Sequence, residues 1–260
     1  MLHHVETGDG SAVLLLHAFP MDSALWAAQR RPLAEAGLRV ITPDLPGFGG
    51  SAVSDEPPSL DVMADAVADL MDHLGIESAV VGGLSMGGYV TMAMMRRHPN
   101  RLAGVILADT RAVADNPEAA ANRLRMATEV EAAGSTVGIA DTMLANLVGP
   151  TTRDTRPEVV ATVRRWIGAQ PAAGVAWAQR AMATRPDSVA DIAGFGGPVL
   201  VLYGDQDVIA PAADAEVMAS AARSGGSPTA VVEIAGAGHL SAIEDPGAVT
   251  RALLGWLHLR

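Results

Sequence analysis

The chain has 260 residues, 49% of them hydrophobic, and carries a formal net charge of −11 at pH 7. Its length and apolar content allow a large buried core in one α/β domain, or in a domain with an insert. The negative charge disfavours nucleic acid and anionic membranes as partners, because both bind lysine and arginine patches. The sequence contains no cysteine, so disulfides, thiolate nucleophiles and thiolate metal ligands are excluded.

The N-terminal region lacks the patterns of export and of membrane insertion. Its longest early apolar stretch, residues 12–16, is far too short to span a bilayer, and no basic segment precedes a long apolar run. We therefore expect a cytoplasmic protein with no signal peptide and no membrane partner. The sequence does not indicate an oligomeric state.

Aliphatic runs alternate with segments of helical periodicity through the first 110 residues. Such runs are typical of strands buried on both faces, and the alternation favours a mostly parallel, doubly wound sheet. Ser59 is placed to cap one helix and Gly75 to end it. The predicted strands cover 2–6, 12–16, 39–42, 79–81 and 104–107, and the predicted helices cover 23–36, 59–74 and a segment that ends at 98.

The pattern changes in residues 113–187, which contain no strand-like aliphatic run. We predict a helical insert here, between core segments 1–112 and 188–260. Its methionine and aromatic residues are expected mainly to pack between insert and core, and some of them to line a pocket. The expected helices of the insert cover 117–133, 137–147, 157–169 and 172–184.

The alternation resumes after the insert. Predicted strands at 199–203 and 229–234 precede two loops, and helices at 212–222 and 246–257 follow them. The first loop carries Asp207 and the second carries His239.

A serine lies between glycines where a predicted strand meets a predicted helix. The segment Gly83-Leu84-Ser85-Met86-Gly87 matches Gly-x-Ser-x-Gly, the nucleophile-elbow pattern. Glycines on both sides leave room for a sharp turn, because they carry no Cβ. The serine hydroxyl is then expected to project at the positive end of the following helix.

A serine hydroxyl needs a neighbouring base, and the base needs a group that orients it. Ser85, Asp207 and His239 occur in the chain order expected for this elbow, and each follows a predicted strand. Because carboxyl ends of parallel strands gather at one edge of the sheet, the three can converge there. The sequence shows no metal-binding motif and no phosphate loop, so we expect no metal and no cofactor.

Four motifs in this order resemble the α/β-hydrolase superfamily over essentially the whole chain. They are the elbow, residues 44–51, Gly-Asp-Gln-Asp-Val-Ile-Ala-Pro at 204–211, and Gly-Ala-Gly-His-Leu with the later Glu-Asp-Pro. Within the superfamily the chain is similar to small carboxylesterases, 3-oxoadipate enol-lactonase-like enzymes and cofactor-free haloperoxidase-like serine hydrolases. The resemblance implies an α/β-hydrolase fold with a helical cap inserted after the strand that ends near Ala108.

The resemblance also implies a function. We expect a carboxylesterase that works through a Ser-His-Asp triad and an acyl-enzyme, with a small-molecule ester or lactone as substrate. Enol-lactone hydrolysis and peracid formation are the alternative activities, and a non-catalytic ligand-binding protein is the alternative from another class. The elbow residue is serine, which argues against epoxide hydrolases and haloalkane dehalogenases, because these need an aspartate there.

The resemblance further assigns supporting residues. The backbone N–H groups of Phe19 and Met86 would form the oxyanion hole. Family members commonly have His-Gly where this chain has His17-Ala18, and His17 is expected to be structural. Asp44 and Ser51 are expected to fix their loop.

Asp207 is the predicted acid because it occupies the family position after the penultimate strand. Asp109, after the strand that precedes the insert, is the alternative, with a turn or helix cap as its ordinary role. Asp205 is expected to face away. The candidate pocket residues are Phe19, Met126, Met143, Leu144, Trp166, Val208 and Leu240, and basic groups for an acidic lactone could come from Arg111, Arg123 or Arg125, unless these are solvated surface residues.

Overall fold

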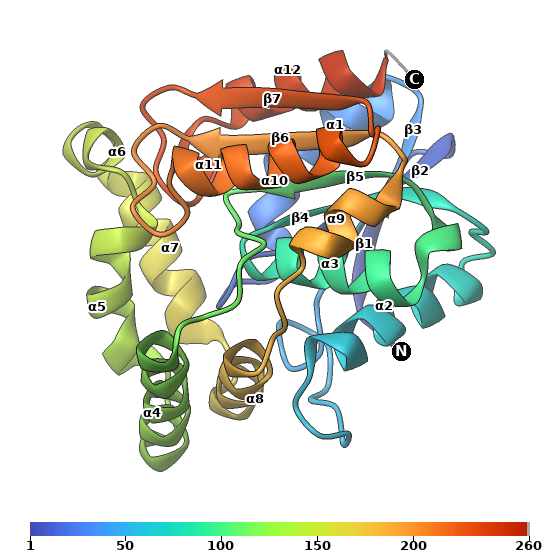
Figure 1. Ribbon diagram of the computed structural model, residues 1–260. Helices are drawn as coiled ribbons and strands as arrows, with labels where there is room; N and C mark the ends of the chain where they lie inside the picture. The colour runs from blue at the N-terminus through green and yellow to red at the C-terminus, as the bar shows by residue number, and fades with distance from the viewer. Residues whose placement is uncertain (259–260) are drawn as a thin grey trace.

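A computed structural model describes residues 1–258, which form one seven-stranded sheet of order β1-β3-β2-β4-β5-β6-β7 (Figure 1). β1 runs antiparallel to β3, and all other neighbouring pairs are parallel. This confirms the predicted α/β-hydrolase fold class. The strands are β1 (His4–Thr7), β2 (Ser11–Leu16), β3 (Leu38–Pro43), β4 (Ala79–Leu84), β5 (Leu102–Ala108), β6 (Val199–Gly204) and β7 (Thr229–Ile234).

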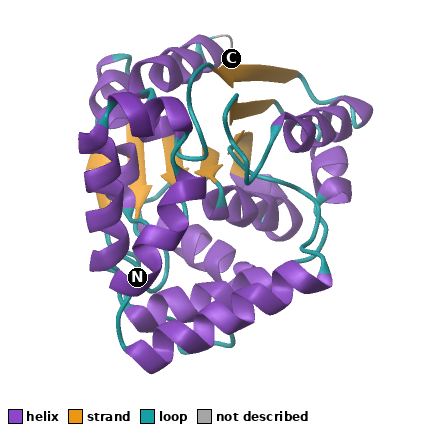
Figure 2. Cartoon of the chain, turned by 90° about the vertical axis from the view of Figure 1, so that its left-hand side faces the viewer, coloured by secondary structure: helices purple, strands orange, loops and turns teal. Residues whose placement is uncertain are grey.

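Helices cover both faces of the sheet, as the side view shows (Figure 2). The central strands are therefore buried on both faces, which explains their continuous aliphatic runs. Buried apolar side chains of the described chain form one cluster on each face. On one face lie α1 (Ala27–Glu35) and α12 (Pro246–Leu257), and on the other α2 (Leu60–His73), α3 (Met86–Arg97), α9 (Val189–Phe195) and α10 (Ala212–Ser224).

Local signals set the ends of these helices. The Ser59 side chain accepts a hydrogen bond from the N–H of Asp61 and caps α2, and Gly75, with φ of 66°, follows its end. β4 extends three residues beyond its predicted range. Gly82 continues this strand because it packs closely on β5, where an added Cβ would lie 2.8 Å from the Cβ of Ile106.

The segment between β5 and α9 is helical, and we refer to α4–α8 as the cap helices. α4 packs against α8 and α5 against α7, at the end of the sheet toward which β6 and β7 point (Figure 1). The cap helices are α4 (Pro117–Ala133), α5 (Val137–Leu147), α6 (Pro150–Thr155), α7 (Pro157–Ala169) and α8 (Ala172–Ala183).

Several short elements differ from the prediction. Residues 23–26 form a 3₁₀ helix, η1 (Ser23–Trp26), where the sequence predicts the start of α1. The helices α6, α9 and α11 (Ser241–Glu244), and the 3₁₀ turn η2 (Pro99–Arg101), were not expected. These elements have three to seven residues, too few to show a helical period.

The cap helices contact the core through glycine backbones. An added Cβ on Gly174 of α8 would lie 1.8 Å from the carbonyl oxygen of Gly47, in the loop after β3. An added Cβ on Gly238 would lie 2.3 Å from the N atom of Gly149, which precedes α6. A side chain at Gly174 or at Gly238 would therefore prevent these close contacts between the cap and the core loops.

Among residues 1–258, no helix has the length and apolar character needed to cross a bilayer.

Candidate active site

Ser85 occupies a strained turn between β4 and α3. Its backbone angles are φ 56° and ψ −112°, a region that side-chain-bearing residues rarely adopt. The neighbouring glycines permit the turn, since a Cβ on Gly83 would lie 2.0 Å from the backbone of Gly87. The N–H of Ser85 donates to Ala108 O at 2.9 Å, and its carbonyl accepts from the hydroxyl of Thr110 at 2.9 Å. The turn is thus held by β5.

Three side chains from separate loops form a hydrogen-bonded triad. His239 Nε2 lies 2.8 Å from Ser85 Oγ, and His239 Nδ1 lies 2.8 Å from Asp207 Oδ2. The second oxygen of Asp207 accepts from the N–H groups of Ile209 and Ala210 at 2.7 and 3.0 Å. Since a carboxylate can only accept, Nδ1 carries the proton and Nε2 is free to accept one from Ser85.

The charges of His239 and Asp207 influence the pKa of each other. Burial by itself would lower the pKa of His239, but the charge and hydrogen bond of Asp207 raise it above the ordinary value. Burial opposes ionisation of Asp207 as well, yet the contact with His239 and the two main-chain donors lower the pKa of Asp207. The pair therefore favours an ionised carboxylate beside an imidazole that accepts protons readily.

Asp109 lies beside this triad but makes no hydrogen bond to it. It is fully buried, with φ of 44°, and its oxygens accept from the N–H of Gly204 at 2.9 Å and from the hydroxyl of Ser241 at 2.5 Å. Burial, and next the charge of Asp207, raise the pKa of Asp109 to about 7. Its contacts are those of a carboxyl that joins β6 to the loop after His239.

Asp205 does not bond His239 and instead accepts from the N–H of Gly236 at 2.7 Å. This contact joins the loops that carry Asp207 and His239.

The main-chain amides of Phe19 and Met86 have no hydrogen-bond partner within the described chain. Phe19 follows His17, which is buried and bonds Ala18 O through Nδ1 at 2.9 Å and Leu45 N through Nε2 at 2.9 Å. Nε2 must therefore be the acceptor, and burial lowers the pKa of His17, so the ring is a neutral brace for the loop.

The loop after β3 is held by Asp44 and Ser51. Asp44 accepts from the N–H groups of Ser23 at 2.8 Å and Gly50 at 2.9 Å, and Ser51 donates to Asp44 O at 2.6 Å. These contacts agree with the expected loop-fixing role.

Glu244 links the His239 loop to the cap, a role that the sequence-based prediction missed. Its buried carboxylate accepts from the N–H of Leu240 at 3.1 Å and from the N–H of Gly149 at 2.8 Å. Arg156 of the cap donates to the carbonyls of Ile243 and Glu244. The residue after His239 is thus tied to the cap through a single carboxylate.

A cavity of about 210 Å³ opens from Ser85 and His239 toward the cap helices. Its polar residues besides these two are Asn122, Arg123 and Gln179. The apolar and aromatic part of its wall consists of Phe19, Tyr89, Met126, Met143, Leu147, Met182 and Ile209.

Of the predicted pocket residues, the structure places Phe19, Met126 and Met143 on this wall. It does not place Leu144, Trp166, Val208 or Leu240 there, which corrects the prediction. Leu144 and Leu240 are buried in a core cluster, Trp166 packs against the same cluster, and Val208 is 67% exposed.

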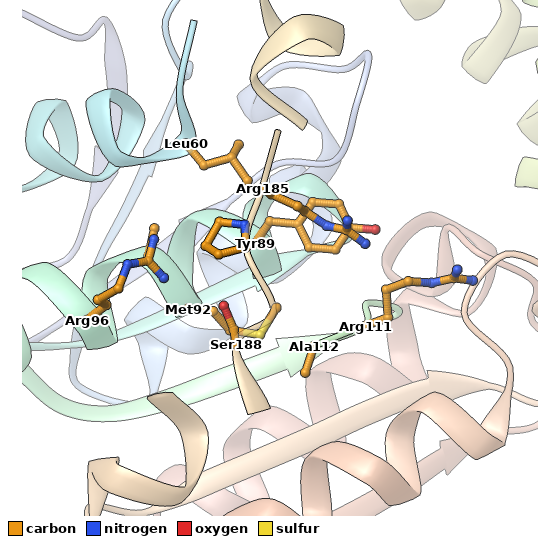
Figure 3. Close-up of a pocket in the computed structure, with 10 residues that line it drawn as sticks. Leu60, Tyr89, Met92, Arg96, Arg111, Ala112, Arg185 and Ser188 are labelled. Atoms are coloured by element: carbon orange, nitrogen blue, oxygen red, sulfur yellow. The ribbon is translucent and has the colours of Figure 1, made fainter. Parts of the chain in front are cut away.

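Tyr89 is a wall residue that the sequence could have indicated. It lies four residues after Ser85, one helical turn along α3, and its N–H donates to Ser85 O at 3.1 Å. The Arg185 guanidinium stacks on the Tyr89 ring, 4.3 Å from its centre, beside a cavity with room for about one water molecule (Figure 3). Nothing in the sequence pattern indicated Gln179.

The candidate arginines lie in different places. Arg111 lines the small cavity behind Tyr89 and pairs with Asp214 at 3.4 Å (Figure 3). Arg125 donates to Asn122 Oδ1 at 2.7 Å. Arg123 alone of the three lines the cavity at Ser85.

No group of three or more histidine, aspartate or glutamate side chains in the described part of the chain is arranged to hold a metal ion.

Comparison with known proteins agrees with this architecture. An esterase from Thermogutta terrifontis, solved with malate bound, matches with a TM-score of 0.94 and 43% identity, covering 99% of this chain and 93% of that chain. The enol-lactonase from Burkholderia xenovorans LB400 matches with a TM-score of 0.89 and 28% identity, covering 99% of this chain and 96% of that chain.

A curated relative is similar over a shorter region. The 2-hydroxy-6-oxo-6-phenylhexa-2,4-dienoate hydrolase of Comamonas testosteroni is 42% identical over 112 residues, which are 41% of this chain and 39% of that hydrolase. The match thus spans well under two thirds of the relative's length. Residues 11–246, by contrast, match the family model described as alpha/beta hydrolase fold, and the chain therefore belongs to this family of hydrolases.

Proposed function

We propose that the protein is a serine esterase that cleaves carboxylic esters through an acyl-enzyme on Ser85. One observation carries the proposal. His239 lies 2.8 Å from both Ser85 Oγ and Asp207 Oδ2, and Ser85 and His239 line a cavity. The structurally similar esterase from Thermogutta terrifontis, which matches over almost the whole of both chains, supports the same reaction class.

The geometry suggests the order of events. Ser85 Oγ attacks the ester carbonyl while His239 Nε2 takes its proton, and Asp207 stabilises the imidazolium. The Phe19 and Met86 amides would donate to the oxyanion, because both N–H groups lack a partner in the described chain. His239 then protonates the leaving alcohol, and a water that it activates releases the acid from Ser85.

Labelling with a fluorophosphonate probe tests the nucleophile. We expect the native protein to be labelled and Ser85→Ala not to be labelled, with 4-nitrophenyl butyrate hydrolysis lost in parallel. Ser220→Ala is the matched control, because Ser220 is an exposed α10 residue bonded to Glu216. If the native protein resists the probe, the chain is a ligand-binding protein of this fold and the proposal fails. If Ser85→Ala is labelled equally, another residue is the nucleophile and the proposed role of Ser85 fails.

Lactone hydrolysis is the second candidate, since the enol-lactonase neighbour is 28% identical over almost the whole chain. The same steps would open a lactone, with the leaving alcohol tethered to the acyl group. A panel of 4-nitrophenyl esters and lactones, compared by kcat/KM on the purified protein, decides between these classes.

A further inference from the structure

We propose that Arg123 and Gln179 form a subsite on the cap side of the cavity, which binds a carboxylate carried by the ester or lactone substrate. This inference rests on the proposed hydrolysis at Ser85 and adds the substrate class. It starts from the division of the cavity wall, where the charged and amide side chains, Asn122, Arg123 and Gln179, all come from the cap helices α4 and α8. A wholly apolar ester would offer no acceptor to those N–H groups of these side chains that lack a strong partner within the protein.

The orientation of Gln179 is determined by its neighbour. Gln179 is 3% exposed, and its Oε1 accepts from Arg123 Nη1 at 3.3 Å. Because a guanidinium can only donate, this contact turns the amide nitrogen of Gln179 toward Met126, whose sulfur lies 2.8 Å away. A thioether is a weak acceptor, so a buried N–H donor on the cavity wall lacks a strong partner.

Other donors surround this one. Asn122 uses its Oδ1 to accept from Arg125, which leaves its amide nitrogen to donate. Arg123 Nη2 has no partner among residues 1–258. The polar side of the cavity therefore offers N–H groups and calls for oxygen acceptors.

The charge of this cluster is positive. Asp115 binds Arg123 Nε at 2.5 Å and lies 3.0 Å from Arg185 Nη1, so two guanidiniums share one carboxylate. The side chains of Asp115 and Arg185 are only 5% and 3% exposed. The Arg185 guanidinium also stacks on the Tyr89 ring (Figure 3). Arg123 is therefore the guanidinium that lines the cavity at Ser85.

Donor groups and one surplus positive charge in a partly buried wall recognise a carboxylate better than a neutral oxygen. The matching substrates are esters of dicarboxylic or keto acids, or lactones that bear a carboxylate, with the charged group directed toward the cap. Either the acyl or the alcohol part could carry this group.

The test compares charged and neutral substrates of equal length on the full chain. One pair is 4-nitrophenyl hydrogen adipate against 4-nitrophenyl heptanoate, and the other is the butyrate ester of 4-hydroxybutanoate against pentyl butyrate. We expect a kcat/KM preference for the charged member of at least one pair of about ten- to hundredfold, the worth of a charged hydrogen bond. Arg123→Gln should remove most of this preference, Arg123→Lys part of it, and Gln179→Leu part of it.

Arg180→Gln is the matched control, because Arg180 follows Gln179 on α8 but pairs with Glu131 outside the cavity. This variant should keep the preference. Calorimetry of Ser85→Ala with monomethyl adipate gives a second readout that needs no turnover, and binding should weaken about tenfold or more in the Ser85→Ala, Arg123→Gln double variant.

The outcomes separate the two proposals. If neutral esters are hydrolysed without preference for either charged substrate, or if Arg123→Gln keeps the preference, the subsite is overturned and the esterase proposal stands. If no ester is hydrolysed but monomethyl adipate binds through Arg123, the esterase proposal fails and the subsite stands. Absence of binding in Ser85→Ala, together with absence of preference, overturns the subsite.

Discussion

Two buried aspartates lie near His239, and their contacts distinguish them. Asp207 bonds the imidazole Nδ1, whereas Asp109 bonds the N–H of Gly204 and the hydroxyl of Ser241. The sequence left both as candidates because each follows a strand whose carboxyl end meets the same edge of the sheet. Only the rotamers and the path of the His239 loop separate an orienting acid from a structural one.

Substitution of each carboxyl tests this assignment. We expect Asp207→Asn to lower kcat by about 10³- to 10⁴-fold, because an amide favours the wrong imidazole tautomer. Asp109→Asn should lower kcat by less than about tenfold, since it leaves the His239 contact in place. Steady-state kinetics with 4-nitrophenyl butyrate measure both, and a larger loss in Asp109→Asn would move the acid to the end of β5.

The pH profile reports the charge around His239. His239 must be neutral to accept the Ser85 proton, so kcat/KM should rise with pH through the His239 pKa. This pKa is raised by Asp207, and further by the charges of Asp109 and Glu244, so the midpoint should lie above the ordinary 6.5. Glu244→Gln should shift the midpoint to lower pH, while Glu216→Gln, a surface change on α10, should leave it in place. An unmoved midpoint in Glu244→Gln would contradict this electrostatic role.

At the scale of elements, glycine contacts decide how the cap helices meet the core. Gly174 of α8 packs on the backbone of Gly47, and Gly138 of α5 has open space around its Cβ position. The sequence shows both as glycines in helical segments, and their periodicity does not separate them. The difference comes from a loop more than 120 residues away in the chain.

Alanine at these two glycines should have opposite effects. Gly174→Ala is expected to destabilise the protein by about 1–3 kcal/mol, because the new methyl group forces the backbones apart. Gly138→Ala should stabilise it by up to about 1 kcal/mol, since alanine favours an exposed helix. Urea unfolding measures both changes, and equal stability of the two variants would show that α8 does not pack on the Gly47 loop.

Over the whole molecule, the cap helices contact the loops that carry the site. α8 lies on the loop after β3, and the turn before α6 is bonded to Glu244 in the His239 loop. Thr151 in α6 also bonds Gln206, the neighbour of Asp207, at 3.0 Å. The position of the cap and the geometry of the site therefore depend on shared contacts.

Asp109 makes the stability of the whole molecule depend on pH. Its pKa rises from 3.8 to about 7 on folding, so the folded state holds more protons between these values. The free energy of unfolding should therefore fall as pH increases from about 4 to about 7. In Asp109→Asn this decrease should be smaller, and Asp9→Asn in an exposed turn should keep the native slope. Urea titrations at pH 5 and pH 8 measure this change in the free energy of unfolding. An unchanged pH dependence in Asp109→Asn would contradict the raised pKa.

The sequence by itself determined the features that depend on local chemistry. The expected range 117–133 agrees with α4, which begins with proline and is followed by Gly134 at φ of 60°, because proline suits a helix start and glycine a left-handed helix end. The elbow glycines, and the order of Ser85, Asp207 and His239, predicted which loops meet. Only the tertiary structure decided that Met143 faces the cavity while Leu144 faces the core, and that Arg123 rather than Arg111 lines it. These choices depend on how the cap helices are rotated against the core, and long-range packing sets that rotation.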